Sequence, residues 1–368
     1  MRSKSDILLV GQTPPPYHGQ AVVTGMLFDH DWGDLKVESL RMAYSDSIEA
    51  VGKFSIGKLW HLGCLILKTW WIALSRRPEV FYYLPASANT APVIRDIIYL
   101  SAVRWCFSKT VFHYHAAGLP EYLDECILLR KLGRFVYACA DVSVEICKSE
   151  SSPGRSFQAH NTVIIPNGVD AISCDQTTRE DDKLVVLFVG VLNEGKGLLD
   201  VIKSAEIMKK SRKNLVFHIV GSWVSQDFER EAKAMIKHAG LCDDFMFLGV
   251  LKGKHKWQAY AEADIFFFPS HYQSENFPMV LLEAMASGLP IISTNWRGIP
   301  QLVEGSDAAI LCDVNAPTQY AEKLTILLDD GARRLDMGIA ARAHYVSNFT
   351  RSKFTQSMHQ MFSELLGR

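Results

Sequence analysis

The sequence lacks the features that mark several classes of protein. Its eight cysteines form no Cys-x-x-Cys pair, which favours reduced thiols over a zinc site or a disulfide framework. Its formal net charge of −1 shows none of the basic excess of a dedicated nucleic-acid-binding protein. It has no charge-free apolar run of about 18 residues, because the nearest candidate, residues 56–74, contains Lys58, His61 and Lys68. The apolar run at 7–10 is too short for the core of a signal peptide. We therefore expect a cytoplasmic protein that binds no nucleic acid.

The composition is that of a globular enzyme with room for two hydrophobic cores. Hydrophobic residues make up 48% of the 368 residues and charged residues 21%. Short apolar runs alternate with segments of helical periodicity, which predicts an α/β fold of doubly wound parallel sheets. The expected strands lie at 6–10, 78–84, 110–115, 142–146 and 163–166, and then at 184–189, 215–220, 245–248, 265–268, 290–293 and 309–312.

A polar stretch at 171–183 separates the two series of strands and has the composition of a linker. We therefore predict an N-terminal domain at 1–172 and a second domain at 183–348. A helix at 349–368 ends the chain and could cross back to the first domain.

The segment that runs from residue 269 to residue 290 carries the strongest local signal. It follows a buried strand, forms a polar loop and enters a short helix at Pro278, because proline suits the first helical position. Gly288 stops the helix. The free N–H groups of Met279 and Val280 then point outward at a helix N-terminus, where the helix dipole favours an anion.

Two carboxylates flank this predicted anion site. Glu275 lies at its mouth, and Glu283 lies about a turn and a half inside the helix. A carboxylate repels phosphate, so the hydroxyl groups of a ribose would suit Glu283, and sugar hydroxyls would suit Glu275. The pattern therefore favours a nucleotide-sugar site, although a core helix with two surface glutamates explains the spacing equally well.

Further positions at strand ends could contact the same ligand. Lys196 lies just before a helix expected at 198–209, where a cation suits a phosphate. Gly19 follows the first strand and allows close backbone approach, although a simple turn explains it as well. His113 and His115 end a strand at the edge where open α/β sheets bind ligands. We expect one imidazole to be buried and that of His115 to face the cleft as a hydrogen-bond donor.

Three alternative interpretations have less support. Residues 190–197 almost match the P-loop of an NTPase, yet Gly197 stands where the magnesium-binding hydroxyl should be. The His113-x-His115 pair could bind a metal, but no cysteine or carboxylate partner is evident and we predict no metal site. The formal Asp-x-Asp at residues 29–31 lies beyond the first helix and is expected to be solvated surface.

In combination these motifs resemble the retaining glycosyltransferases of family 4. The resemblance spans nearly the whole chain. It rests on Pro14-Pro15-Pro16 with Gly19, His113-Tyr114-His115, Ile165-Pro166-Asn167-Gly168-Val169-Asp170, Gly190 with Lys196-Gly197, and Glu275 with Glu283-Ala284-Met285-Ala286-x-Gly288-x-Pro290. It implies the GT-B fold, in which two Rossmann-like domains face a cleft. The first domain would then lie on the acceptor side, and the second would bind the donor.

The resemblance also implies roles for single residues. The donor would be a nucleoside-diphosphate sugar, with UDP or GDP as the expected nucleotide, and no cofactor would be needed. The implied donor contacts are Lys196 and the amides of Met279 and Val280 on the diphosphate, Glu283 on the ribose, Glu275 on the sugar, and Val250 and Leu251 on the base. Asn276, Phe277 and Pro278 belong to the same donor-binding loop. From the first domain, Gly19 would approach the phosphates and His115 would lie near the anomeric centre.

Two departures from the family pattern concern charge. Val191 stands where the family usually has an arginine, and Arg297-Gly298 stands where it has a Gly-Gly turn. The glutamate that usually follows that turn is Gln301 here. We hypothesise that Arg297 partly replaces the missing cation.

The expected reaction is the transfer of a sugar, with retention of configuration, to a glycan or a lipid-linked acceptor. Lys196 and the helix-end amides would cover the phosphates, so the reaction should need no metal ion and should proceed in EDTA. One alternative is another sugar-nucleotide enzyme on the same fold, such as an epimerase or a phosphorylase. Another is a catalytically silent nucleotide-sugar binder, which the loss of the arginine at Val191 favours.

Residues 36–109 also suggest a membrane contact. They contain ten Lys or Arg against five Asp or Glu, and four of the eight tryptophans. Basic and aromatic surface of this kind suits the inner face of an anionic membrane. Most of the aromatic side chains are nevertheless expected to face the core.

Overall fold

The computed structural model describes residues 4–15, 19–42, 56–116, 118–148, 151–172, 183–209, 214–273 and 275–368. The chain forms two compact units, Met1–Gly168 with Arg351–Arg368, and Val169–Thr350. The first unit thus ends at Gly168, four residues before the domain end that the sequence predicts. Most of the predicted linker, residues 173–182, lies outside the described residues, as do residues 16–18 of the loop before Gly19.

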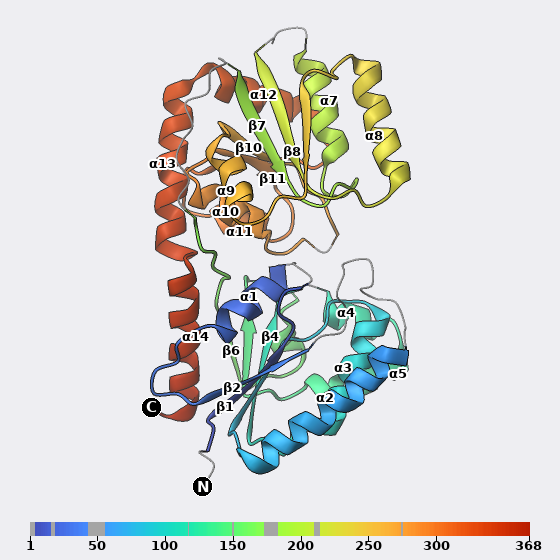
Figure 1. The fold of residues 1–368 in the computed structure, drawn as a ribbon, viewed down its shortest axis with the longest axis vertical. Helices are drawn as coiled ribbons and strands as arrows, with labels where there is room; N and C mark the ends of the chain where they lie inside the picture. The colour runs from blue at the N-terminus through green and yellow to red at the C-terminus, as the bar shows by residue number, and fades with distance from the viewer. Residues whose placement is uncertain are drawn as a thin grey trace. The chain divides into compact units, whose positions relative to one another are not determined.

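The first unit is built on six parallel strands in the order β2-β1-β3-β4-β5-β6 (Figure 1). Its strands are β1 (Ile7–Gly11), β2 (Val37–Arg41), β3 (Val80–Tyr83), β4 (Lys109–Tyr114), β5 (Val142–Glu145) and β6 (Asn161–Ile164). Its helices are α1 (Gly19–Phe28), α2 (Ile56–Ser75), α3 (Thr90–Val103), the 3-10 helix η2 (Arg104–Cys106), α4 (Leu119–Asp124), α5 (Ile127–Tyr137), α6 (Pro153–Ser156) and α14 (Arg351–Leu366). The sequence did not predict β2, because its partly exposed residues form no apolar run. The last strand, β6, begins two residues earlier than expected.

Helix α14 belongs to the first unit. Its Phe362 side chain is fully buried, with its ring centroid 5.5 Å from that of Trp32 and 5.8 Å from that of Tyr82. The chain beyond it is held by an ion pair of 2.7 Å between Arg368 and Asp6. The helix therefore completes the core of the first unit rather than that of the second.

The second unit is built on six parallel strands in the order β12-β11-β10-β7-β8-β9. Its strands are β7 (Leu184–Val189), β8 (Leu215–Val220), β9 (Phe245–Gly249), β10 (Ile265–Phe268), β11 (Ile291–Thr294) and β12 (Ala309–Cys312). Its helices are α7 (Leu198–Met208), α8 (Gln226–Ala239), α9 (Gly253–Ala261), α10 (Met279–Ala286), α11 (Ile299–Val303), α12 (Pro317–Asp329) and α13 (Gly331–Asn348). The predicted fold class, two doubly wound parallel sheets, is confirmed.

The strand order of the second unit places its candidate site. The chain starts at β7 in the middle of the sheet, winds outward through β8 and β9, and returns to β10 on the other side of β7. Ligands of such sheets bind where the winding reverses, outside the carboxyl ends of the two middle strands. The loops after β7 and β10 lie at this point, and they contain Lys196 and Glu275.

None of the helices in the described ranges is both long enough and apolar enough to span a bilayer.

We predict that Phe362→Ala lowers the free energy of unfolding of the first unit by about 3–5 kcal/mol, because it empties a fully buried aromatic site. Hydrogen exchange measured by mass spectrometry should show faster exchange throughout the first unit. The control is Gln356→Ala on the exposed face of the same helix, which should change stability by less than about 0.5 kcal/mol. Destabilisation of the second unit alone would contradict the assignment of α14.

Candidate functional site

Lys196 and Glu275 form an ion pair at the switch point of the second sheet, the place where the winding of the chain reverses. The Lys196 ammonium binds Glu275 Oε2, and Ser270 Oγ donates to the same carboxylate oxygen at 2.8 Å. Only 6% of Glu275 is exposed. The structure therefore brings Lys196 and Glu275 together, as the sequence predicts. The sequence placed Glu275 at the mouth of the site, but its side chain is buried.

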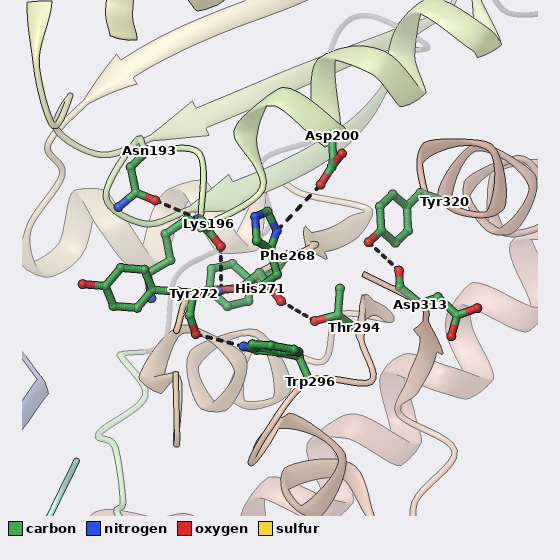
Figure 2. A network of polar contacts seen from close by, with 12 residues as sticks. Asn193, Lys196, Asp200, Phe268, His271, Tyr272, Thr294, Trp296, Asp313 and Tyr320 are labelled. Carbon is green, nitrogen blue, oxygen red and sulfur yellow. Dashed lines mark hydrogen bonds and ion pairs between the residues drawn. The ribbon is translucent and has the colours of Figure 1, made fainter. Parts of the chain in front are cut away.

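Aromatic rings and a short loop hold the lysine in place. Its ammonium lies 4.8 Å from the ring centroid of Tyr272 and 5.6 Å from that of Phe268, within the range of cation–π attraction. The backbone N–H of Lys196 donates to Asn193 Oδ1 at 2.8 Å. Figure 2 shows this network, in which the Tyr272 carbonyl accepts a hydrogen bond of 2.9 Å from the indole of Trp296.

Gly197 shows why this loop is not a P-loop. Its φ of +83° is left-handed, and a Cβ there would lie 2.2 Å from the carbonyl oxygen of Pro269. A serine or threonine, which a P-loop needs for magnesium, would collide with the backbone of the neighbouring loop. The same contact fixes the loop after β7 against the loop after β10.

Helix α10 presents its N-terminus beside these loops and is anchored at both ends. Pro278 is its N-cap rather than its first helical residue, so the helix begins one position later than the sequence suggests. Met279 and Val280 are then the first two helical residues, and their N–H groups have no partner inside the helix. At the other end, the Arg342 guanidinium donates to the carbonyl of Ala286.

The loop before the helix is fixed by a close backbone contact. A Cβ on Gly298 would lie 1.9 Å from the carbonyl oxygen of Asn276, so only glycine is compatible with this packing. Phe277 packs against Phe349, with the ring centroids 6.0 Å apart. The loop residues Asn276 and Phe277 are thus held by the second unit's own core.

Glu283 lies inside α10 with two partners that the sequence did not reveal. Its carboxylate forms an ion pair with Lys256 and accepts a hydrogen bond of 2.9 Å from Tyr260 Oη. Burial, reinforced by the Glu283 charge, raises the pKa of Tyr260 well above its ordinary value, so the hydroxyl remains a donor. Lys256 and Tyr260 are one helical turn apart on α9, which is the only signal that could have linked them.

Val250 and Leu251 form the turn between β9 and the helix that carries Lys256. Val250 is 59% exposed, and Leu251 packs partly against the core. An exposed apolar side chain at the carboxyl end of a strand is available to a flat ligand. The contact with a base that the sequence implies for both residues stays a prediction.

Arg297 lies on the solvent-exposed side of this site. Its guanidinium carbon lies 5.5 Å from the ring centroid of Trp296, whose indole binds the Tyr272 carbonyl. Its φ of +48° is left-handed, a conformation in which non-glycine residues are uncommon. Val191 is exposed in the loop after β7. The hypothesis that Arg297 compensates for Val191 stays open.

His113 and His115, at the carboxyl end of β4, differ as expected in one respect. His113 is fully buried, with Nδ1 2.7 Å from Tyr82 Oη, and its ring centroid lies 4.2 Å from that of His115. Burial, with a smaller effect from His115, lowers the pKa of His113 well below its ordinary value of 6.5. His113 is therefore neutral and structural. His115, which follows β4, and Gly19, which begins α1, keep their predicted roles as hypotheses.

The described ranges contain no group of three or more His, Cys, Asp or Glu residues arranged to hold a metal ion. Asp29 and Asp31 are exposed after α1, as predicted.

Comparison with known proteins finds a family model that matches the second unit. Residues 172–344 match the family model for glycosyl transferases group 1. Spore coat protein SA of Bacillus subtilis (strain 168) is 30% identical over 189 residues, which are 50% of this chain and 49% of that protein. D-inositol 3-phosphate glycosyltransferase of Paenarthrobacter aurescens (strain TC1) is 32% identical over 166 residues, 44% of this chain and 40% of that protein. The chain therefore matches half or less of the length of these curated relatives.

Solved structures show the same fold over nearly the whole chain. Sucrose-phosphate synthase of Thermosynechococcus elongatus aligns with a TM-score of 0.75 at 15% identity, covering 99% of this chain and 100% of that one. Anabaena HepE in complex with UDP-glucose aligns with a TM-score of 0.71 at 17% identity, covering 97% and 99%. The chain thus has the GT-B fold, and its second unit matches the family model of the group 1 glycosyltransferases.

We predict that the buried His113 makes the protein less stable in acid. The unfolded chain takes up a proton below pH 6.5 whereas the folded chain does not, so stability should fall by up to about 1.4 kcal/mol per pH unit as pH drops below that value. Above pH 6.5 this contribution is constant. Urea unfolding of His113→Gln at pH 5.5 and 7.5 should show a smaller pH dependence than the wild-type protein. The control is His238→Gln at an exposed position; equal pH dependence of all three proteins would contradict the prediction.

Proposed function

We propose that the protein is a retaining glycosyltransferase that moves a sugar from a nucleoside-diphosphate sugar, most simply UDP- or GDP-linked, to a glycan or a lipid-linked acceptor. The observation that carries this proposal is the position of Lys196. It lies in the loop after β7, paired with a buried carboxylate from the loop after β10, where the winding of the sheet reverses. The UDP-glucose bound to HepE and the name of the inositol phosphate relative support the same chemistry.

The ion pair suggests how the donor enters. A diphosphate carries more negative charge than one carboxylate, so it competes with Glu275 for the Lys196 ammonium. Glu275 keeps its hydrogen bond from Ser270 and becomes available to the hydroxyls of the donor sugar. The N–H groups at the start of α10 supply further donors to the phosphates.

The nucleoside would extend toward α9. Glu283 is already bound to Lys256 and Tyr260, so its carboxylate is oriented before the ligand arrives. A ribose with two adjacent hydroxyls can donate to this carboxylate, and the base would then reach the turn at Val250 and Leu251.

The chemical step breaks the bond between the anomeric carbon and the β-phosphate oxygen. Negative charge grows on that oxygen, and the electron pair leaves with the nucleoside diphosphate. One fixed donor such as Lys196 contributes on the order of 3 kcal/mol to this step, or roughly a hundredfold in rate. The acceptor hydroxyl attacks from the face that the phosphate leaves and gives its proton to the departing phosphate, so configuration is retained. Fixed cations and amides neutralise the phosphates, which makes the proposed reaction independent of a metal ion.

A catalytically silent nucleotide-sugar binder is the second candidate, because the exposed Val191 supplies no charge in the loop after β7. A silent binder would be stabilised by the donor but would neither hydrolyse it nor transfer its sugar. An epimerase would convert the donor without any acceptor. Analysis of the products formed with and without an acceptor distinguishes the transferase, the silent binder and the epimerase.

We predict that Lys196→Ala lowers kcat by roughly a hundredfold or more, since it removes the cation that stabilises the leaving group. The same change should abolish the rise in Tm that a UDP-, GDP- or ADP-sugar gives the wild-type protein. The control is Lys237→Ala, an exposed position in the last turn of α8. The double variant Lys196→Met with Glu275→Gln removes both charges and leaves no unpaired buried carboxylate. Its activity therefore tests the role of the lysine even if the single variant does not fold. Full activity of Lys196→Ala would reject the proposed role.

We predict that Arg297→Ala raises the donor KM by about threefold to tenfold, because one exposed cation is lost from the proposed phosphate side of the site. Arg297→Asn serves as the matched variant, since asparagine tolerates the left-handed backbone that Arg297 adopts. Both variants should show the same rise if the charge is responsible. Unchanged donor KM and kcat in both would remove the idea that Arg297 replaces the family's arginine.

A further inference from the structure

The outer side of α2 exposes large apolar side chains to solvent. Trp60 is 77% exposed and Leu74 is 79% exposed, and Leu67 and Trp71 lie between them. Spacings of seven, four and three residues place these four on one side of the helix. The opposite side packs into the core through the apolar Leu62, Leu65 and Ile72 and through the buried Thr69. One side of α2 thus packs against the core, and the other is exposed to solvent.

The tryptophans of residues 36–109 differ from the other aromatic residues there. Phe81, Tyr82, Tyr83 and Tyr99 are fully buried, as expected for most aromatic side chains of this range, whereas Trp60, Trp70, Trp71 and Trp105 are all substantially exposed. Helical spacing reveals that a helix has an apolar side, but a helix with two such sides does not reveal which one is buried.

The exposed apolar surface continues from α2 to α5. The indole of Trp70 donates to the carbonyl of Ala102 in the last turn of α3 at 2.9 Å. Trp105, in η2 directly after α3, packs against Phe135 of α5 with ring centroids 5.3 Å apart. Helix α3 packs against both α2 and α5, and all three lie on one side of the first sheet, away from α14 (Figure 1).

Helix α5 extends the same surface with a second exposed row. Its exposed apolar residues are Ile127, Leu128, Leu132 and Phe135. Its buried residues, Gly133, Val136 and Tyr137, face the core. We name the exposed side chains of α2, η2 and α5 the α2–α5 face.

The charge on these two helices has one sign. Helices α2 and α5 contain no Asp or Glu, and their cations are Lys58, Lys68, Arg130, Lys131 and Arg134. An exposed apolar surface that extends over two neighbouring helices marks a protein or membrane contact. Next to α5, Asp124 pairs with Arg134 at 3.6 Å, so cations outnumber carboxylates here but do not stand alone. Exposed tryptophan with an excess of lysine and arginine beside it has the chemistry of a bilayer interface with anionic headgroups.

We propose that the α2–α5 face docks the protein on an anionic lipid bilayer. The apolar side chains enter the headgroup and acyl boundary, and the cations lie at the level of the phosphates. The site differs from the broad region suggested by the sequence. Strand β3 within 36–109 is buried, residues 43–55 lie outside the described residues, and α5 lies beyond that range. The proposal does not depend on the transferase activity, because it concerns helices of the first unit only.

The test is flotation of the full chain with vesicles of neutral phosphatidylcholine, alone or with about one-third phosphatidylglycerol. The wild-type protein should float with the anionic vesicles and do so less at high salt. Trp60→Ser with Leu67→Ser and Leu74→Ser should weaken binding by about tenfold or more, because three apolar insertions are lost. Lys68→Gln with Lys131→Gln and Arg134→Gln should weaken it by roughly fivefold per charge.

The matched control is Leu335→Ser with Ile339→Ser, which removes two exposed apolar side chains from α13 of the second unit and should leave flotation unchanged. Donor-induced thermal shifts of every variant report on the second unit separately, so a loss of donor binding cannot be mistaken for a loss of docking. Failure of the wild-type protein to float with either vesicle overturns the proposal. So does equal flotation of the serine variant and the control. A dimer in sedimentation that the serine variant dissociates, without vesicle binding, would assign the face to a second copy of the chain instead.

Discussion

The ion pair between Lys196 and Glu275 is the interaction on which the candidate site depends. Glu275 is almost fully buried, and a buried carboxylate is stable only when it is paired and hydrogen-bonded. Its partners come from two loops that follow adjacent strands, and Gly197 allows those loops to touch. The protein therefore holds a cation at the switch point by giving it an internal anion, which an incoming phosphate can replace.

The positions of the site loops could be predicted from the sequence because parallel strands end at a common edge. Buried strands read as apolar runs, so the residues after them, Lys196 and Glu275 among them, are expected to converge. The start of α10 was predicted to within one residue, since Pro278 cannot continue a helix from its N-terminal side. Strand β2 was missed, because an edge strand with partly exposed residues has no apolar signature.

Other parts of the site could not be predicted because they depend on distant contacts. Lys256 binds Glu283 across 27 positions of sequence, and nothing in the local pattern of α9 links the two. The exposure of Trp60 and Trp71 follows from which side of α2 meets α3, a choice that periodicity leaves undetermined. The sequence shows that Gly197 replaces the hydroxyl residue of a P-loop, but the contact with Pro269 that requires glycine there is visible only in the structure.

The return of α14 to the first unit makes the second unit an insertion between two parts of one core. During synthesis, the ribosome produces all of Val169–Thr350 before the helix that fills the space beside Trp32 and Tyr82. The second unit can reach its native state early, whereas the first must wait, with an apolar groove uncovered, until α14 emerges. We therefore expect the second unit to fold before the first during synthesis. A chaperone that holds unfolded chains would then bind the first unit, which is synthesised earlier.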